Sequence, residues 1–178
     1  REIVIPSSVE KFGNIMFGFC AELSKVTLPA GITDLGILTF IGCESLDTIN
    51  TSNITVIGDS AFRGCVSLRT LSLENVVSIG AAAFAESSVY GVIDAPKLEY
   101  IGLHGFESAY NIVGFDAPNL KVIEEAAFMN CYNLASFAFS DSLEKVGIMA
   151  FYCDTTGGIP RLTSFYLSDK RSTSGKIN

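Results

Sequence analysis

The chain of 178 residues has no tryptophan, a single histidine (His104), and 12 basic residues against 19 acidic ones. The net charge of −7 argues against nucleic acid and against an anionic membrane surface, because both demand basic residues on the protein. No uncharged apolar run reaches the ~18 residues of a membrane helix, so we expect no membrane span. His104 pairs with no carboxylate at a metal-ligand spacing, and it stands at a variable repeat position, whereas a Cys–His nucleophile would also need an orienting partner and a pocket. We therefore expect no cofactor, no metal and no catalysis.

What the chain has is a repeat. Phenylalanine returns every 22 or 23 residues, at Phe17, Phe40, Phe62, Phe84, Phe106, Phe128 and Phe151. Glycine stands four positions before each of these residues except Phe128, where Glu124 takes its place. Large apolar residues recur one position before that glycine and at six and nine positions after the phenylalanine. A period of this length predicts stacked copies of one small unit, which share a continuous core.

The local pattern within a unit predicts its geometry. Residues 68–73 (Leu-Arg-Thr-Leu-Ser-Leu) end with alternation at period two, which predicts a strand, and turn-forming residues follow. The glycine before the phenylalanine is expected to supply a backbone angle that other residues resist. The segment from the glycine through the cysteine position, such as residues 80–85, predicts one or two turns of α-helix or 3₁₀-helix.

The sequence thus predicts an α/β solenoid of about seven repeats, with a parallel β-sheet on one face and short helical or 3₁₀ turns and irregular return segments on the other. Residues 1–167 form the single domain, which we expect to start in the middle of a repeat. The insertion at residues 154–160 is interpreted as a surface loop, and residues 168–178 as a polar C-terminal tail.

Four of the five cysteines share one repeat position, three after the phenylalanine: Cys20, Cys43, Cys65 and Cys131. Ser87 and Ala109 fill the same slot in other units. We interpret the cysteines as free thiols packed in a buried column. Disulfide pairing and metal binding are the alternatives.

The outward positions of the strands form the candidate binding surface. They are mostly small and polar, and the candidate ligand-binding residues are Lys25, Thr27, Thr48, Asn50, Thr70, Ser72, Asp94, Asp116, Ser136 and Tyr166. Asp94 and Asp116 occupy the same slot in adjacent units, so they are expected to lie roughly 5 Å apart. A solvated acidic pair is the interpretation we favour. Calcium binding is the alternative, although calcium prefers six or more oxygen ligands.

The repeat resembles the BspA-type leucine-rich repeat, through the pattern Ile57, Gly58, Ala61, Phe62, Cys65, Leu68, Leu71 and Leu73. The resemblance covers residues 3 to about 167. It implies a right-handed leucine-rich solenoid, displayed on a bacterial or protist cell surface or secreted. It also implies adhesion to proteins, host extracellular-matrix or cell-surface proteins among them, and it brings no catalytic residues.

These observations lead to one functional hypothesis and two alternatives. We expect a non-enzymatic protein-interaction or adhesion module of an exported, extracellular or cell-surface protein. One alternative is a structural spacer that presents another domain of a longer chain. The other is a carbohydrate-binding module, which predicts exposed aromatic residues in a groove.

Overall fold

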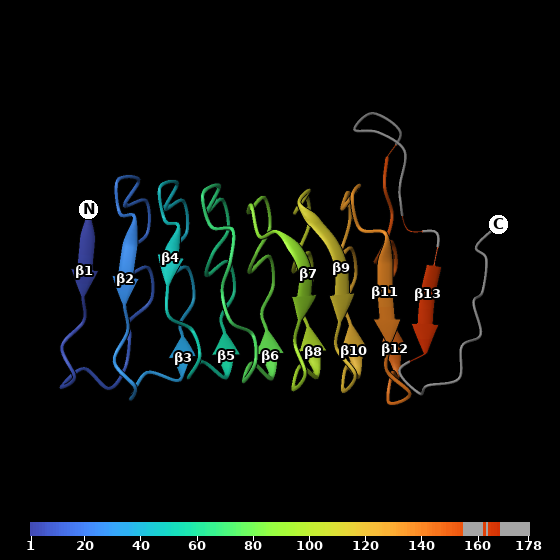
Figure 1. Ribbon diagram of the computed structural model, residues 1–178, viewed down its shortest axis with the longest axis horizontal. Helices are drawn as coiled ribbons and strands as arrows, with labels where there is room; N and C mark the ends of the chain where they lie inside the picture. The colour runs from blue at the N-terminus through green and yellow to red at the C-terminus, as the bar shows by residue number, and fades with distance from the viewer. Residues whose placement is uncertain (155–161, 163, 168–178) are drawn as a thin grey trace.

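The computed structural model describes residues 1–154, 162 and 164–167 (Figure 1). The chain winds as a solenoid whose strands run in two rows along its length, and neighbouring strands in each row are parallel. We number the repeat units 1 to 7 after their phenylalanines, Phe17 to Phe151. The predicted parallel solenoid of about seven turns is therefore confirmed.

The first row of strands is the predicted one. It consists of a three-stranded sheet, β1 (Glu2–Val4), β2 (Lys25–Thr27) and β4 (Thr48–Ile49), and a four-stranded sheet, β7 (Gly91–Asp94), β9 (Ile112–Asp116), β11 (Ser136–Phe139) and β13 (Ser164–Leu167). Equivalent residues of successive units pair, as in Ile3, Val26 and Ile49. Val26 and Ile49 are buried while their neighbours are exposed, since alternate residues of a strand face opposite sides of the sheet.

The second row was not predicted. It is a six-stranded sheet of two-residue strands: β3 (Asp34–Leu35), β5 (Val56–Ile57), β6 (Ser78–Ile79), β8 (Tyr100–Ile101), β10 (Val122–Ile123) and β12 (Lys145–Val146). The second residue of each strand is the apolar position before the repeat glycine. It is fully buried from Leu35 to Ile123, whereas Val146 in β12 is exposed. This sheet runs without interruption from unit 2 to unit 7.

The prediction of helical or 3₁₀ turns is wrong for the described residues, which contain no helix and hence none that could cross a membrane. The cause is a left-handed residue two positions before each phenylalanine, such as Leu38 (φ 60°) and Ala82 (φ 51°). A helix cannot continue through that conformation. The N–H groups point along the solenoid instead: Leu38 and Phe40 donate to the carbonyls of Asp59 and Ala61, each at 2.8 Å.

The expectation for the repeat glycine also needs correction. The positive φ angles lie at other positions, and from unit 3 onwards close packing requires the repeat glycine instead, whereas a Cβ on Gly13 in unit 1 would meet no neighbouring atom. A Cβ on Gly58 would lie 2.7 Å from Leu35 O, and one on Gly102 would lie 2.7 Å from Ala81 N. The glycine therefore allows one turn of the backbone to approach the turn of the preceding unit.

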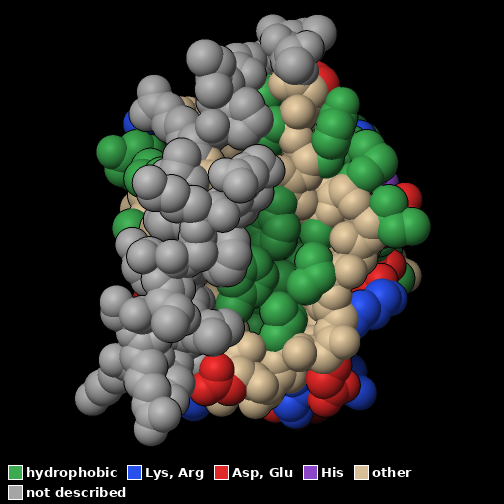
Figure 2. All heavy atoms as spheres, turned by 90° about the vertical axis from the view of Figure 1, so that its right-hand side faces the viewer, with side chains coloured by type: hydrophobic (Ala, Val, Ile, Leu, Met, Phe, Trp, Pro, Cys, Tyr) green, Lys and Arg blue, Asp and Glu red, His purple; other side chains and the backbone are tan. Residues whose placement is uncertain are grey.

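The phenylalanine column fills the centre of the solenoid. Ring centroids of consecutive members from Phe17 to Phe151 are 5.0–5.5 Å apart, with interplanar angles of 2–13°. Phe115 and Phe137 form a shorter second stack, which meets this column edge-on. Seen from one end, apolar side chains gather inside a frame of backbone, and charged ones lie on the rim (Figure 2). The phenylalanine column is part of the continuous core that the repeat period predicts.

The first row of strands is interrupted in unit 3. Residues 68–73, where the sequence predicts a strand, form none, although Leu68 and Leu73 are buried. The reason lies in unit 4, where Val89 is buried and Tyr90 is 61% exposed, so Tyr90 does not fill the leucine slot its position predicts. Gly91 (φ 87°) and an irregular register at Gly91–Val92 then lead into β7. This offset leaves β7 out of register with unit 3.

Two remaining predictions fall on residues that the structure does not describe. They are the surface loop, of which residues 155–160 lie outside the described residues, and the polar tail at residues 168–178.

Candidate functional site

The candidate residues lie in or next to the first row of strands and in residues 70–72 of unit 3, and we call the outward side of these segments the strand surface. Strand pairing places Lys25 beside Thr48, Asp94 beside Asp116, and Ser136 beside Gly114. Lys25, Thr27, Thr48, Asn50, Thr70, Asp94 and Asp116 are exposed, and Ser72 and Ser136 are half-buried. Tyr166 belongs to β13 opposite Ala138, and its side chain lies outside the described part of the structure.

Asp94 and Asp116 form the pair that the sequence suggested as an alternative calcium site. Asp94 and Asp116 are direct partners in the β7–β9 register and both are exposed. Within the described residues, no group of three or more histidine, cysteine, aspartate or glutamate side chains is arranged to hold a metal. Two carboxylates supply fewer oxygens than calcium prefers. What the pair does supply is concentrated negative charge at one point of the strand surface.

Asn50 has a structural task. Its Oδ1 accepts a hydrogen bond from Leu28 N–H at 2.7 Å, and its Nδ2 donates to Leu28 O at 2.9 Å. The neighbouring Thr51, which replaces a leucine of the repeat, is buried and donates its hydroxyl to Ser72 O at 2.7 Å. These side chains satisfy backbone groups near the point where the strand ladder ends. Asn50 is therefore engaged in the fold.

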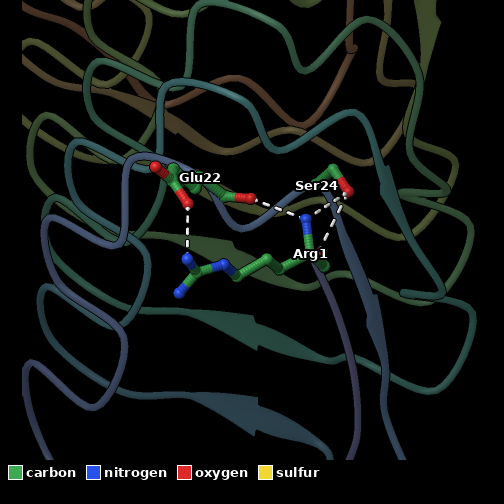
Figure 3. A network of polar contacts seen from close by, with 3 residues as sticks. All are labelled: Arg1, Glu22 and Ser24. Carbon is green, nitrogen blue, oxygen red and sulfur yellow. Dashed lines mark hydrogen bonds and ion pairs between the residues drawn. The ribbon is translucent and has the colours of Figure 1, made fainter.

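Ion pairs flank the sheet at its first strands. Lys25 Nζ lies 3.3 Å from Glu2 Oε2 on the strand surface. At the same end, the Arg1 amino group donates to Glu22 O at 2.7 Å and to Ser24 Oγ at 3.2 Å, and its guanidinium lies 3.1 Å from the Glu22 carboxylate (Figure 3). These groups are exposed, so each pair contributes little to stability. They order the first strand against unit 1.

The strand surface carries a groove of about 390 Å³ beside the interruption. Residues 69–74 of unit 3 form one wall, and Tyr90, Val92, Ile93 and Asp94 form the other. Thr70, Ser72 and Asp94 were among the sequence candidates. The sequence candidates did not include Arg69, Glu74, Tyr90 or Val92, and a tyrosine in place of the repeat leucine was the signal that could have pointed to this part of the surface.

A second groove, of about 660 Å³, lies against the two-residue strands near the first units. Its wall includes Glu10, Asp34 and Asp59 together with Lys11. Asp59 has a structural role, because its Oδ1 accepts a hydrogen bond from Ala81 N–H of the next unit at 2.8 Å. This groove contains none of the sequence candidates.

The cysteines are free thiols, and most of the aligned ones are buried as predicted. Cys43, Cys65 and Cys131 each donate to the carbonyl of the preceding unit's phenylalanine at 3.0–3.1 Å, whereas Cys20 is exposed. Burial raises the pKa of Cys43 to about 11 and that of Cys65 to about 12. Burial also raises the pKa of the Cys131 thiol. A thiol with such a pKa is inert as a nucleophile near neutral pH.

His104 is a turn residue with φ 56° in unit 5. Its Nδ1 lies 3.1 Å from Glu107 Oε2, an ion pair only when the imidazole is protonated. Its position two before Phe106 explains the setting: every unit places a left-handed residue there, whatever its chemistry. The geometry therefore makes His104 one of the left-handed residues of the repeated turn.

The comparisons with known proteins agree with this architecture. The sequence profile described as "BspA type Leucine rich repeat region", with 6 copies, matches residues 1–113 and 77–170. The solved leucine-rich repeat protein of T. pallidum (TpLRR) superimposes with a TM-score of 0.71 at 24% identity, over 83% of this chain and 72% of that one, and supports the fold alone.

Two other solved structures are more distant. A leucine-rich repeat protein from Bacteroides ovatus has a TM-score of 0.34 at 18% identity, over 92% of this chain and 78% of that one. A leucine rich cell surface protein from Faecalibacterium prausnitzii has a TM-score of 0.32 at 18% identity, over 92% and 70%. No curated protein sequence matches the chain. With its repeats matched along almost its whole length, the chain belongs to the BspA-type leucine-rich repeat family.

Proposed function

We propose that the chain is a non-enzymatic protein-interaction module, exported and displayed at a cell surface, which binds a protein ligand through its strand surface. The family supports a repeat protein suited to binding other proteins. Adhesion to a host extracellular-matrix or cell-surface protein is the specific form that the sequence resemblance favours.

One observation carries the proposal. The repeated apolar positions are buried in the core, while the polar strand positions lie on the outer face of two sheets, one on each side of unit 3, and within each sheet the strands are in fixed register. A surface of this kind offers many weak contacts side by side to a protein ligand. The buried thiols and His104, which lies in the repeated turn, do not point to catalysis.

The test is binding to a panel of extracellular-matrix proteins, measured by biolayer interferometry on the purified chain and two variants. Asp94→Lys cancels the net negative charge of the aspartate pair, and we expect it to weaken binding at least tenfold. Glu44→Lys makes the same charge change at an exposed turn residue outside the strand surface, and should leave binding unchanged. Equal affinity of both variants for every ligand bound would contradict the strand-surface proposal.

The spacer alternative makes the opposite prediction for the same experiment. A chain that only presents another domain binds none of the panel, and neither substitution changes anything. The carbohydrate alternative requires aromatic side chains in a groove, and Tyr90 is the aromatic residue that lines the groove of the strand surface. Binding of oligosaccharides that is lost in Tyr90→Ala would favour it.

A further inference from the structure

The interruption of the first row of strands leaves a free sheet edge in the middle of the molecule. β4 ends one sheet and β7 begins the next, with residues 68–73 between them (Figure 1). Units 3 and 4 are hydrogen-bonded to each other at both ends of the gap. Tyr90 N–H donates to Arg69 O at 2.9 Å, and Lys97 Nζ donates to Asn75 Oδ1 at 2.5 Å. The gap is therefore a short, bounded window in an otherwise stacked solenoid.

The edge of β7 that faces this window presents backbone groups that make no bond. Ala95 N–H donates to Asp116 O, so Ala95 and Ile93 direct their backbone groups towards β9. Alternate residues of a strand bond to opposite neighbours, so the N–H and C=O groups of Val92 and Asp94 point towards unit 3. No hydrogen bond of the described residues uses them. Exposed strand edges of this kind are templates for pairing with another chain.

The side chains around the window define what could pair there. Val92 is 68% exposed, and the half-buried Leu71 also lines the groove, so part of its lining is apolar. Glu74, Asp94 and the adjoining Asp116 carry negative charge, and Arg69 at the other end carries positive charge. A small molecule would leave the row of backbone groups unmatched. An extended peptide offers donors and acceptors at the matching spacing, and a basic residue would complement the acidic end.

We propose that this window binds one extended peptide segment of the protein ligand, about four residues long, which adds as a strand to the free edge of β7 and places a lysine or arginine near Asp94 and Asp116. The peptide follows the groove between unit 3 and β7, and its ends leave towards solvent. This proposal rests on the proposed function, since it names the part of the ligand that the strand surface would recognise.

The first test uses an immobilised library of random heptapeptides as the probe. We expect selected binders to combine β-branched residues with a basic residue. Backbone pairing predicts that N-methylation of alternate amides of such a peptide, those facing β7, lowers affinity at least tenfold, whereas N-methylation of the intervening amides does not. A library without binders, or binders indifferent to both methylation patterns, would overturn the proposal.

The second test reads the edge directly, by amide hydrogen exchange of the chain with and without a selected peptide. The amides of Val92 and Asp94 should slow at least tenfold on binding, while that of Ile93, which already faces β9, should change little. Equal slowing of all three amides, or no slowing at Val92 and Asp94, would contradict strand addition. Self-association of the chain through the same edge would also contradict it, and would show as a dimer in sedimentation without peptide.

A pair of variants separates this proposal from the proposed function. Val92→Pro removes the edge N–H and should abolish peptide binding, whereas Val92→Thr keeps that N–H and should preserve it. The N-methylated peptides decide the question if Val92→Pro does not fold. If Asp94→Lys weakens binding of a matrix protein while Val92→Pro has no effect, strand addition is wrong and the strand-surface function stands. If peptides bind at the edge but no protein ligand depends on Asp94, the strand-surface function fails.

Discussion

At the scale of the residue, the phenylalanine column does most to hold the repeat units together. Each inner ring is fully buried and stacks with nearly parallel planes on two others, as Phe84 does on Phe62 and Phe106 at centroid distances of 5.3 and 5.0 Å. Phe137 also contacts rings of both neighbouring units, Phe115 and Phe151, but the second stack to which it belongs is shorter. Truncating an inner phenylalanine should therefore weaken the packing of three units. Truncating a phenylalanine at the end of the column should weaken the packing of only two.

We predict that Phe84→Ala lowers the free energy of unfolding by about 3–5 kcal/mol, because it leaves a large cavity between Phe62 and Phe106. Urea denaturation followed by circular dichroism measures the loss. Phe17→Ala is the matched control, since Phe17 is only partly buried and should cost clearly less. Equal losses at the two positions would show that the column does not couple neighbouring units.

The cysteine slot gives a second prediction at this scale. Ser87 occupies it in unit 4, where its hydroxyl is buried and has no hydrogen-bond partner. In units 2 and 3 a thiol in the same slot donates to the preceding phenylalanine carbonyl. We expect Ser87→Cys to raise stability by about 0.5–1.5 kcal/mol, and Ser87→Ala by less, since it removes the unpaired hydroxyl without adding a bond. A thermal melt in which the serine protein is the most stable of the three would contradict this.

At the scale of the element, the turn around the phenylalanine replaces the expected helix. It repeats a left-handed residue two before the phenylalanine, and in units 1 to 6 another two after it, for which units 2 and 3 use Gly42 and Gly64. The N–H groups of the turn then bond from unit to unit, as the strands do. The turn is thus a third ladder along the solenoid, built from strained residues that the ladder holds in place.

This strain can be tested at adjacent alanines. Ala82 has φ 51°, so Ala82→Gly relieves an unfavourable conformation and should raise stability by about 0.5–1 kcal/mol despite the added chain entropy. Ala83 is fully buried without a positive φ, and Ala83→Gly should lower stability instead. Differential scanning calorimetry of the two variants should give shifts of opposite sign. Two shifts of the same sign would show that the left-handed residue carries no strain.

The sequence alone predicted the stacked columns of equivalent residues. It did not predict the two-residue strands, the left-handed turns or the gap at unit 3. The buried apolar positions and the Asp94–Asp116 pairing follow from the period, because equal spacing stacks equal slots. Two-residue strands such as β5 have too few residues to show an alternation. The turn positions carry leucine, serine, alanine and histidine alike, so their shared left-handed angle has no signature in composition. The gap at unit 3 arises from a one-residue offset at Val89 and Tyr90, which depends on packing and not on a motif.

At the scale of the whole molecule, the gap raises the question of whether the solenoid folds as one unit or two. Across units 3 and 4 the first row of strands makes no ladder, yet three other connections continue. β5 pairs with β6, Phe62 stacks on Phe84 at 5.3 Å, and the turn ladder runs through Phe62 N–H to Ala83 O at 2.8 Å. A repeat protein whose neighbouring units remain this strongly coupled should unfold cooperatively.

We therefore predict a single unfolding transition, and the chain offers separate probes for its two halves. All six tyrosines lie at residue 90 or beyond and there is no tryptophan, so intrinsic fluorescence reports on units 4 to 7. Cys43 and Cys65 lie in units 2 and 3, and replacing Cys20, Cys131 and Cys153 by serine leaves them as the only thiols. In urea, thiol labelling and tyrosine fluorescence of that variant should give the same midpoint. Midpoints that differ beyond error would show that the gap at unit 3 divides the molecule into two independently unfolding blocks.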